Sequence, residues 1–68
     1  GYDKDAEIEK LKKELDYNER FLKSVQNKLM NKDFVNNAPD TIVNKEKQKI
    51  IDTDLKIKSL KKSITDLS

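Results

Sequence analysis

The sequence predicts an all-α fold in which two long helices form an antiparallel coiled-coil hairpin, joined by a short turn around residues 31–38. Three observations support this prediction. Of the 68 residues, 41% are charged and only 34% are apolar, and so small a chain cannot build a compact core from so few apolar side chains. The chain contains one Gly and one Pro, which favours long helices. Apolar residues recur at alternating steps of three and four in two separate stretches.

The first helix is expected over about residues 4–31. Its apolar stripe has the heptad spacing of a coiled-coil seam. The seam positions are Ile8, Leu11, Leu15, Asn18, Leu22, Val25 and Leu29. Asn18 is the polar member of this set, and a buried Asn in a coiled coil commonly fixes the register. Asn31 is a suitable residue to end the helix.

A second helix is expected over about residues 39–67, after a break that ends at Pro39. Proline suits the first turn of a helix, and Asp40 suits the positive end of the helix dipole. The second seam comprises Val43, Glu46, Ile50, Thr53, Ile57, Leu60, Ile64 and Leu67. Residues predicted to shape the turn are Asn31, Phe34, Ala38, Pro39 and Val43, with Phe34 as its apolar anchor.

The length of the turn predicts the direction and register of the pairing. About seven residues can join adjacent antiparallel helices but cannot span the length of a parallel pair. If the numbers of paired residues add up to 75, every layer of the seam matches an a position with a d position. The layers are Leu29–Glu46, Val25–Ile50, Leu22–Thr53, Asn18–Ile57, Leu15–Leu60, Leu11–Ile64 and Ile8–Leu67. In this register Glu14 and Lys56 lie close enough to attract each other.

Large apolar residues are concentrated around the turn. They are Met30, Phe34, Val35, Ile42 and Val43. One interpretation is an apolar plug that closes the end of the seam. The other is a tip that contacts a partner.

Charge is distributed unevenly along the chain. Residues 1–19 contain four bases and seven acids and have a net charge of −3, whereas residues 20–62 contain eleven bases and five acids and have a net charge of +6. The bases of the middle and distal parts include Arg20, Lys23, Lys28, Lys32, Lys45, Lys47, Lys49, Lys56 and Lys58. A basic stripe on an elongated rod is typical of a phosphate-binding surface, although coiled coils also carry many lysines as an ordinary solvated face.

Two aromatic residues lie beside the first seam. Tyr17 and Phe21 are four positions apart and therefore share one face of the helix. Phe21 either folds over the edge of the seam with Tyr17 against it, or forms an exposed platform for an unstacked base or for another domain.

The composition excludes several classes of site. The chain has no Cys and no His, so disulfides, zinc clusters and His-based acid–base catalysis are absent. No Gly-rich phosphate loop and no cluster of carboxylates in a cleft is expected, so the chain is predicted to be non-catalytic and to hold no cofactor or metal. No apolar run reaches the length of a membrane span and no signal peptide is visible. The chain begins with Gly1 rather than Met, and we expect a segment of a longer protein.

The stretch KLMNKDFVNNAPDTIVNKEKQK, from residue 28 to 49, resembles the turn of the C-terminal tRNA-binding arm of valyl-tRNA synthetases. That family reads approximately K-L-x-N-x-x-F-V-x-K-A-P-x-x-V-V-x-K-E-R-x-K between heptad helices. The matching residues are Lys28, Leu29, Asn31, Phe34, Val35, Ala38, Pro39, Val43, Lys45, Glu46 and Lys49. The departures are Asn37 in place of Lys, Ile42 in place of Val and Lys47 in place of Arg. Length and phase of the helices extend the resemblance over nearly the whole chain.

The resemblance implies an arm that contacts the outer corner of the L-shaped tRNA, where the D and T loops meet. The implied partners are a valine tRNA and the other domains of a cytoplasmic, ATP-dependent valine–tRNA ligase, and the isolated arm is expected to be monomeric. Candidate RNA-binding residues are Arg20, Phe21, Lys23, Lys28, Lys45, Lys47, Lys49 and Lys56. Two alternatives remain: a structural or protein-interaction coiled coil without RNA binding, and the terminal arm of an ATP-binding cassette translation or DNA-repair factor.

Overall fold

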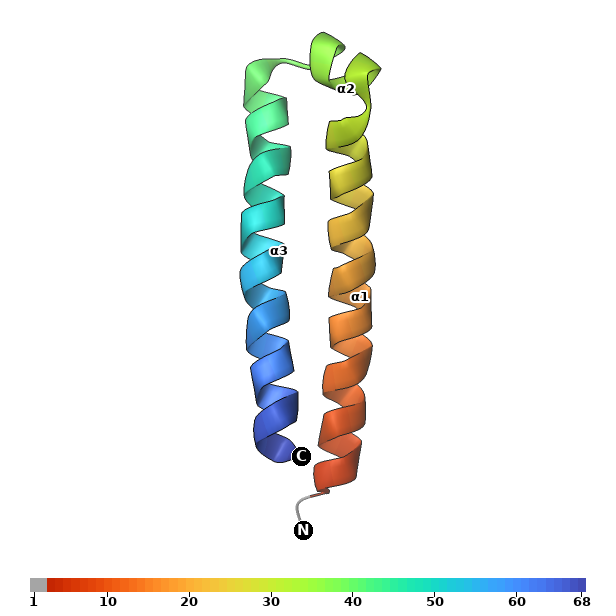
Figure 1. Ribbon diagram of the computed structural model, residues 1–68, viewed down its shortest axis with the longest axis vertical. Helices are drawn as coiled ribbons and strands as arrows, with labels where there is room; N and C mark the ends of the chain where they lie inside the picture. Colours follow the sequence, from red (N-terminus) through yellow and green to blue (C-terminus); the bar gives the residue numbers. More distant parts are fainter. Residues whose placement is uncertain (1–2) are drawn as a thin grey trace.

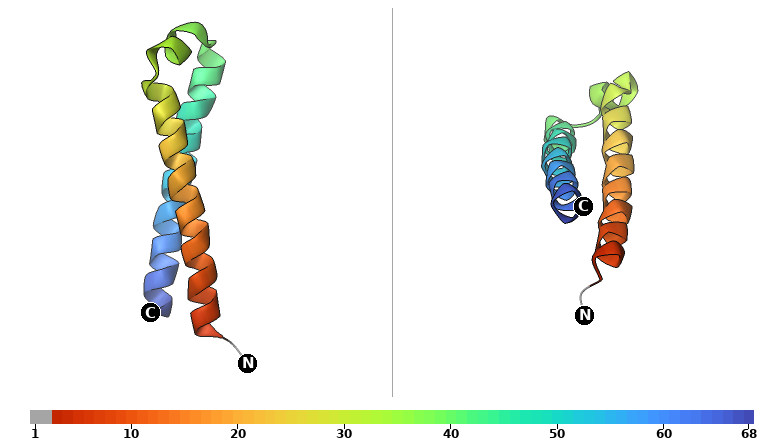
Figure 2. Two further views of the ribbon diagram at one scale, coloured as in Figure 1. Left: turned by 90° about the vertical axis from the view of Figure 1, so that its right-hand side faces the viewer. Right: turned by 60° about the horizontal axis from the view of Figure 1, so that its bottom comes forward.

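A computed structural model describes residues 3–68 as a helical hairpin (Figure 1). Helix α1 (Lys4–Met30) and helix α3 (Asp40–Leu67) run antiparallel, and the short helix α2 (Lys32–Asn37) lies at the tip between them. The start of α1 and the end of α3 lie together at the opposite end, here called the base. Figure 2 shows that the two long helices wind across each other. The result is a rod of 53 × 16 × 14 Å.

The predicted fold class is therefore confirmed, and α1 begins with a standard cap. The Asp3 side chain accepts a hydrogen bond from the Ala6 N–H at 3.1 Å, which satisfies one of the free donors of the first turn. Asp5 and Glu7 add negative charge at the positive end of the helix. Gly1, on which the expectation of a longer protein rests, lies outside the described residues.

The turn contains a helix that the sequence did not predict. Asn31 ends α1, and its N–H donates to the Lys28 carbonyl at 3.2 Å. Its side-chain oxygen then accepts from the N–H groups of Asp33 (3.0 Å) and Phe34 (3.4 Å). Asn31 is thus both the C-cap of α1 and the N-cap of α2. Because the same residue ends one helix and starts the next, the chain turns through α2 rather than through irregular backbone.

Pro39 directs the entry into α3 from just outside the helix. It occupies the N-cap position, and α3 begins at Asp40, one residue later than expected. The Pro39 side chain forms no capping hydrogen bond, but its carbonyl accepts from the N–H groups of Ile42 (3.0 Å) and Val43 (3.1 Å). Asp40 provides the negative charge in the first turn.

The seam lies where the heptad spacing places it. All fifteen predicted seam positions are buried or half-buried in the structure. The most buried ones are Asn18, Val25, Val43, Glu46, Thr53, Ile57 and Leu60. Two ion pairs between α1 and α3 fit the predicted register: Lys28–Glu46 at 3.5 Å and Glu14–Lys56 at 3.6 Å. The second of these confirms the predicted attraction between Glu14 and Lys56.

Asn18 acts differently from the expected register-fixing residue. Its side-chain amide donates to the Glu14 carbonyl at 2.7 Å, so the bond stays within α1. It satisfies the buried amide without linking the two helices. If Asn18 favours one register, it does so through the cost of burying its amide at other positions of the seam, and not through a hydrogen bond to α3.

The apolar plug at the tip is smaller than expected. Val43 is buried and Phe34 is half-buried, so these two side chains close the end of the seam. Met30, Val35 and Ile42 are exposed, and the plug interpretation is wrong for them. Within residues 3–68, no helix is long and apolar enough to cross a membrane.

Candidate nucleic-acid interface

One side of the hairpin carries two facing rows of side chains, which we call the groove flank. Residues spaced four and three positions apart share one face of a helix. On α1 this row is Tyr17, Phe21, Ser24 and Lys28, and on α3 it is Lys45, Lys49, Asp52 and Lys56. Each row lies directly beside the seam, so the two rows border each other along the rod.

An open groove of about 240 Å³ lies at the basal end of this flank. It is lined by Tyr17, Asn18, Phe21, Asp52, Thr53 and Lys56. Tyr17 is 70% exposed and Phe21 is 37% exposed. Phe21 thus covers the edge of the seam in part and still presents ring surface to solvent, whereas Tyr17 stands largely free. The structure therefore agrees in part with both interpretations of this pair: Phe21 covers the edge of the seam, and both rings present surface to solvent.

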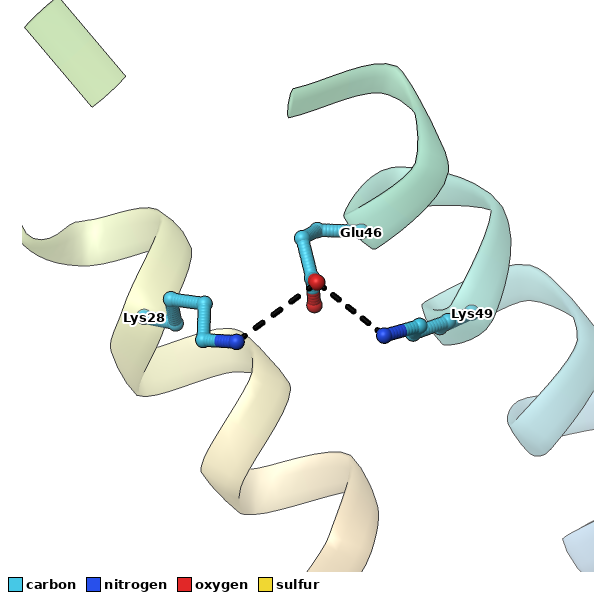
Figure 3. Close-up of polar contacts among 3 residues, drawn as sticks. All are labelled: Lys28, Glu46 and Lys49. Atoms are coloured by element: carbon cyan, nitrogen blue, oxygen red, sulfur yellow. Dashed lines mark hydrogen bonds and ion pairs between the residues drawn. The ribbon is translucent and has the colours of Figure 1, made fainter. Parts of the chain in front are cut away.

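Distal to the groove, a buried carboxylate joins the two helices (Figure 3). Glu46 Oε1 lies 3.0 Å from Lys49 Nζ and 3.5 Å from Lys28 Nζ. The Glu46 side chain is only 8% exposed, and the two lysines are about half exposed. Lys28 Nζ also lies 5.6 Å from the centroid of the Phe34 ring, within cation–π range. The cluster therefore ties α1, α2 and α3 together at one point.

Glu46 stays ionised because of these partners. The hydrogen bond from Lys49 lowers its pKa below the ordinary value of 4.5, and the charge of Lys28 acts in the same direction. Burial acts in the opposite direction but does not prevail. Glu46 Oε2 has no hydrogen-bond partner among the described residues, so the carboxylate is held through Oε1 alone.

The structure divides the eight candidate RNA-binding residues into two groups. Five lie on the groove flank: Phe21, Lys28, Lys45, Lys49 and Lys56. Arg20 lies on the outer side of α1, where its Nε is 3.1 Å from Asp16. Lys23 and Lys47 are exposed, but their helical positions turn them away from this flank. One continuous surface can therefore include at most the first group.

The site also includes three residues that were not predicted from the sequence to belong to it: Glu46, Asp52 and Thr53. A signal for Glu46 was present, because a charged residue at a seam position requires partners, and Lys49 follows it by one helical turn. Asp52 and Thr53 gave no comparable signal, since they enter the site only by lining the groove together with Phe21. Among residues 3–68, no three potential metal ligands come together.

One family model covers almost the whole chain. Residues 3–68 match the family model described as the valyl tRNA synthetase tRNA binding arm. The chain belongs to this family. All candidate residues of this arm lie within the matched range, including the groove and the Glu46 cluster.

Relatives of the arm are valine–tRNA ligases. The chain is 53% identical over 66 residues to the valine–tRNA ligase of Christiangramia forsetii and 46% identical over 65 residues to the valine–tRNA ligase of Bacteroides fragilis. It is 43% identical over 63 residues to that of Enterococcus faecalis. These alignments cover 97%, 96% and 93% of the arm but only 8%, 7% and 7% of the relatives. No solved structure gives a significant match.

Proposed function

We propose that the arm lays its groove flank against the outer corner of a tRNA, where the D and T loops meet, and thereby positions the tRNA for valylation. The catalytic step belongs to other parts of a parent valine–tRNA ligase, which acts in the cytoplasm and is much longer than this chain. The arm itself contributes binding and orientation, and no residue of it takes part in the chemistry.

The observation that carries the proposal is the combination of bases and an aromatic ring on one flank. Lys45, Lys49 and Lys56 follow one face of α3 over a length of about 16 Å. Lys28 of α1 shares Glu46 with Lys49, and Phe21 lines the groove together with Lys56. Lysine contacts to phosphates provide affinity and orientation without reading sequence, which suits an arm that steadies a folded RNA.

The groove supplies the local contact that lysines cannot provide. Its volume of about 240 Å³ is below the size of a typical pocket for drug-like ligands, so it suits a single flat ring. Bases at a tRNA corner are unpaired or loop-closing, and such bases stack on aromatic side chains. Tyr17 and Phe21 both border the groove and the solvent, and we assign the stacking contact to Phe21 because its ring is also held at the edge of the seam.

An NMR titration tests this proposal. The isotope-labelled chain is titrated with a valine tRNA transcript at low and moderate salt, and with a control RNA that has the acceptor stem but lacks the D–T corner. We expect amide shifts along residues 17–28 and 45–56 that fade with salt and are absent with the control. If neither RNA moves these amides at low salt, or both act alike, the proposal is wrong.

Matched lysine variants locate the surface. Lys45→Gln removes a base from the groove flank, and Lys62→Gln removes one from the exposed outer side of α3. We expect Lys45→Gln to lower the salt dependence of tRNA binding by about one unit of slope, and Lys62→Gln to leave it almost unchanged. Equal effects of the two variants would show a nonspecific polycation instead.

A second pair of variants tests the stacking contact. Phe21→Leu keeps an apolar side chain at the edge of the seam but removes the aromatic face, and we expect binding to weaken by about 1–3 kcal/mol. Tyr17→Leu is the comparison on the same wall of the groove, one helical turn away, and a smaller effect is expected there. Unchanged affinity of the Phe21 variant would remove stacking from the proposal and leave only phosphate contacts.

The alternative function is a structural or protein-interaction hairpin without RNA binding. It is favoured by Ile51 and Leu55, which are 54% and 61% exposed and lie one helical turn apart on the outer side of α3. Sedimentation equilibrium separates the two functions. The alternative predicts association that Leu55→Lys abolishes, together with no response to tRNA.

A further inference from the structure

Glu46 is an unusual residue for the seam of a coiled coil. Seam positions are normally apolar because a charged group there loses its hydration. Glu46 is nevertheless among the most buried residues of the hairpin, in the layer where the register places Leu29. A side chain that only filled this layer would be better replaced by an apolar one, so its charge requires another explanation.

The two partners of Glu46 come from different helices and converge on one atom. Nζ of Lys28 in α1 and Nζ of Lys49 in α3 both lie within 3.5 Å of Oε1, and Figure 3 shows both side chains directed towards the carboxylate. An ammonium group has three N–H donors, and a single bond to Glu46 leaves donors unused on each lysine. Both lysine side chains are about half exposed, so these donors remain accessible to a second anion.

We propose that Glu46 is a positioning residue that holds Lys28 and Lys49 together as one phosphate-binding pair for tRNA. This inference rests on the proposed function, because it assigns a role within the same flank. The ligand of the pair is a backbone phosphate that bridges the two helices. Phe34 supports the arrangement from α2, since its ring lies beneath the Lys28 ammonium.

Preorganisation explains why a negative charge can help to bind a phosphate. A free lysine on a helix surface samples many rotamers and loses that freedom when it binds. Lys28 and Lys49 have already lost part of it, because their contacts to Glu46 fix where both ammonium groups lie. Binding is tighter when the ordering has occurred in the free protein.

Simple electrostatics predicts the opposite effect, which makes the proposal testable. If Glu46 merely adds negative charge beside the binding surface, its neutralisation should strengthen tRNA binding. If it positions the lysines, its neutralisation should weaken binding although the chain becomes more positive. The two accounts therefore differ in the sign of one measured change.

The experiment compares Glu46→Gln with Asp54→Asn in fluorescence anisotropy with a valine tRNA transcript. Both substitutions remove one negative charge from α3, but Asp54 lies off the groove flank and pairs with Lys58 at 3.2 Å. We expect Glu46→Gln to bind about fivefold more weakly than the unsubstituted chain and Asp54→Asn to bind equally or slightly more tightly. Equal or tighter binding by Glu46→Gln would overturn the inference.

Glu46→Leu separates positioning from folding. Leucine suits a seam position, so this variant should melt at or above the temperature of the unsubstituted chain in circular dichroism. We expect it to bind tRNA as weakly as Glu46→Gln. If Glu46→Leu binds as tightly as the unsubstituted chain, Glu46 serves the fold alone and the inference fails.

Lysine substitutions provide an independent readout. Lys28→Gln and Lys49→Gln should be non-additive in the presence of Glu46, because each removes half of one shared site. In the Glu46→Gln background the two effects should become additive. Additivity in both backgrounds would contradict a pair. If the unsubstituted chain fails to bind tRNA, the proposed function itself fails; if it binds and only the Glu46 predictions fail, the proposed function stands.

Discussion

The basal and distal parts of the rod differ in how polar the seam between the helices is. Near the base, the seam is apolar, yet Ile8, Leu11, Ile64 and Leu67 are only half-buried. Farther along, three of the most buried residues are polar: Asn18, Glu46 and Thr53. The layers from Asn18 to Glu46 therefore give up part of the free energy of an apolar seam, and they border the groove and include the Glu46 cluster.

Under the proposed function, this difference divides stability and binding along the rod. Apolar layers such as Leu15–Leu60 stabilise the hairpin, whereas the polar seam residues border the groove or hold the lysines. The charges do not follow this division: residues 1–19 carry a net charge of −3, but the end of α3 that lies beside them adds the bases Lys58, Lys61 and Lys62.

The largest effect that tests this division is the loss of an apolar layer. Leu60→Ala should lower the free energy of unfolding by about 3 kcal/mol, because Leu60 is buried in the seam. The matched control is Leu55→Ala, which truncates an exposed leucine of the same helix and should change it by less than about 0.5 kcal/mol. Both values come from urea unfolding followed by circular dichroism. Similar costs at the two positions would contradict the assigned seam.

The tip should contribute less than the apolar layers. Phe34→Ala should lower the free energy of unfolding by about 2 kcal/mol, since the ring is half-buried against the end of the seam. Val35→Ala is the control at the adjacent exposed position and should have little effect. If Phe34→Ala proves as mild as Val35→Ala, α2 does not close the seam. Thermal unfolding of the two variants provides the comparison.

A polar seam residue should be replaceable with a gain in stability. Asn18→Leu should raise the free energy of unfolding by about 1 kcal/mol, because a buried amide is exchanged for an apolar side chain. Leucine has room to extend here, since Asn18 lines the groove. The variant should also weaken tRNA binding by filling that groove. Asn27→Leu, at an exposed position of the same helix, should do neither. A less stable Asn18 variant would show that the amide is required by the fold.

The smallest expected effect is the dependence of stability on pH. The pKa of Glu46 is lowered in the folded state, so between the folded and unfolded pKa values the unfolded chain binds more protons, and stability rises with pH there. The contribution is complete above the ordinary value of 4.5 and is lost as the pH falls through the folded pKa. Unfolding of Glu46→Gln should lack this component. If the free energy of unfolding depends on pH in the same way in Glu46→Gln and in the unsubstituted chain, the described contacts of Glu46 are contradicted.

The fold followed from the sequence because heptad spacing and turn length are strong constraints. Positions such as Val25 and Ile57 could be placed in the seam by counting alone. Helix α2 could not be predicted in this way, because six residues are too few to form a helix by their own propensity. Its formation depends on how Asn31 is oriented once α1 has ended.

The site was predicted less completely, for a related reason. The heptad positions of Arg20, Lys23 and Lys47 place these residues away from the groove flank. The sequence therefore contained enough information to exclude them from the site. The contact of Lys28 and Lys49 with one oxygen of Glu46 is decided by rotamers and by the approach of two helices. Such details arise from tertiary packing, which a single sequence does not encode position by position.

The cross-helix ion pairs also imply an order of folding. Lys28 and Glu46 are 18 positions apart in the chain, whereas Glu14 and Lys56 are 42 apart. Closing the shorter loop costs less chain entropy, so the hairpin should zip from the tip towards the base. The Glu46 cluster would then form in the transition state, ahead of the apolar layers that provide most of the stability. Kinetic measurements should find that Phe34→Ala mainly slows folding and Leu60→Ala mainly speeds unfolding.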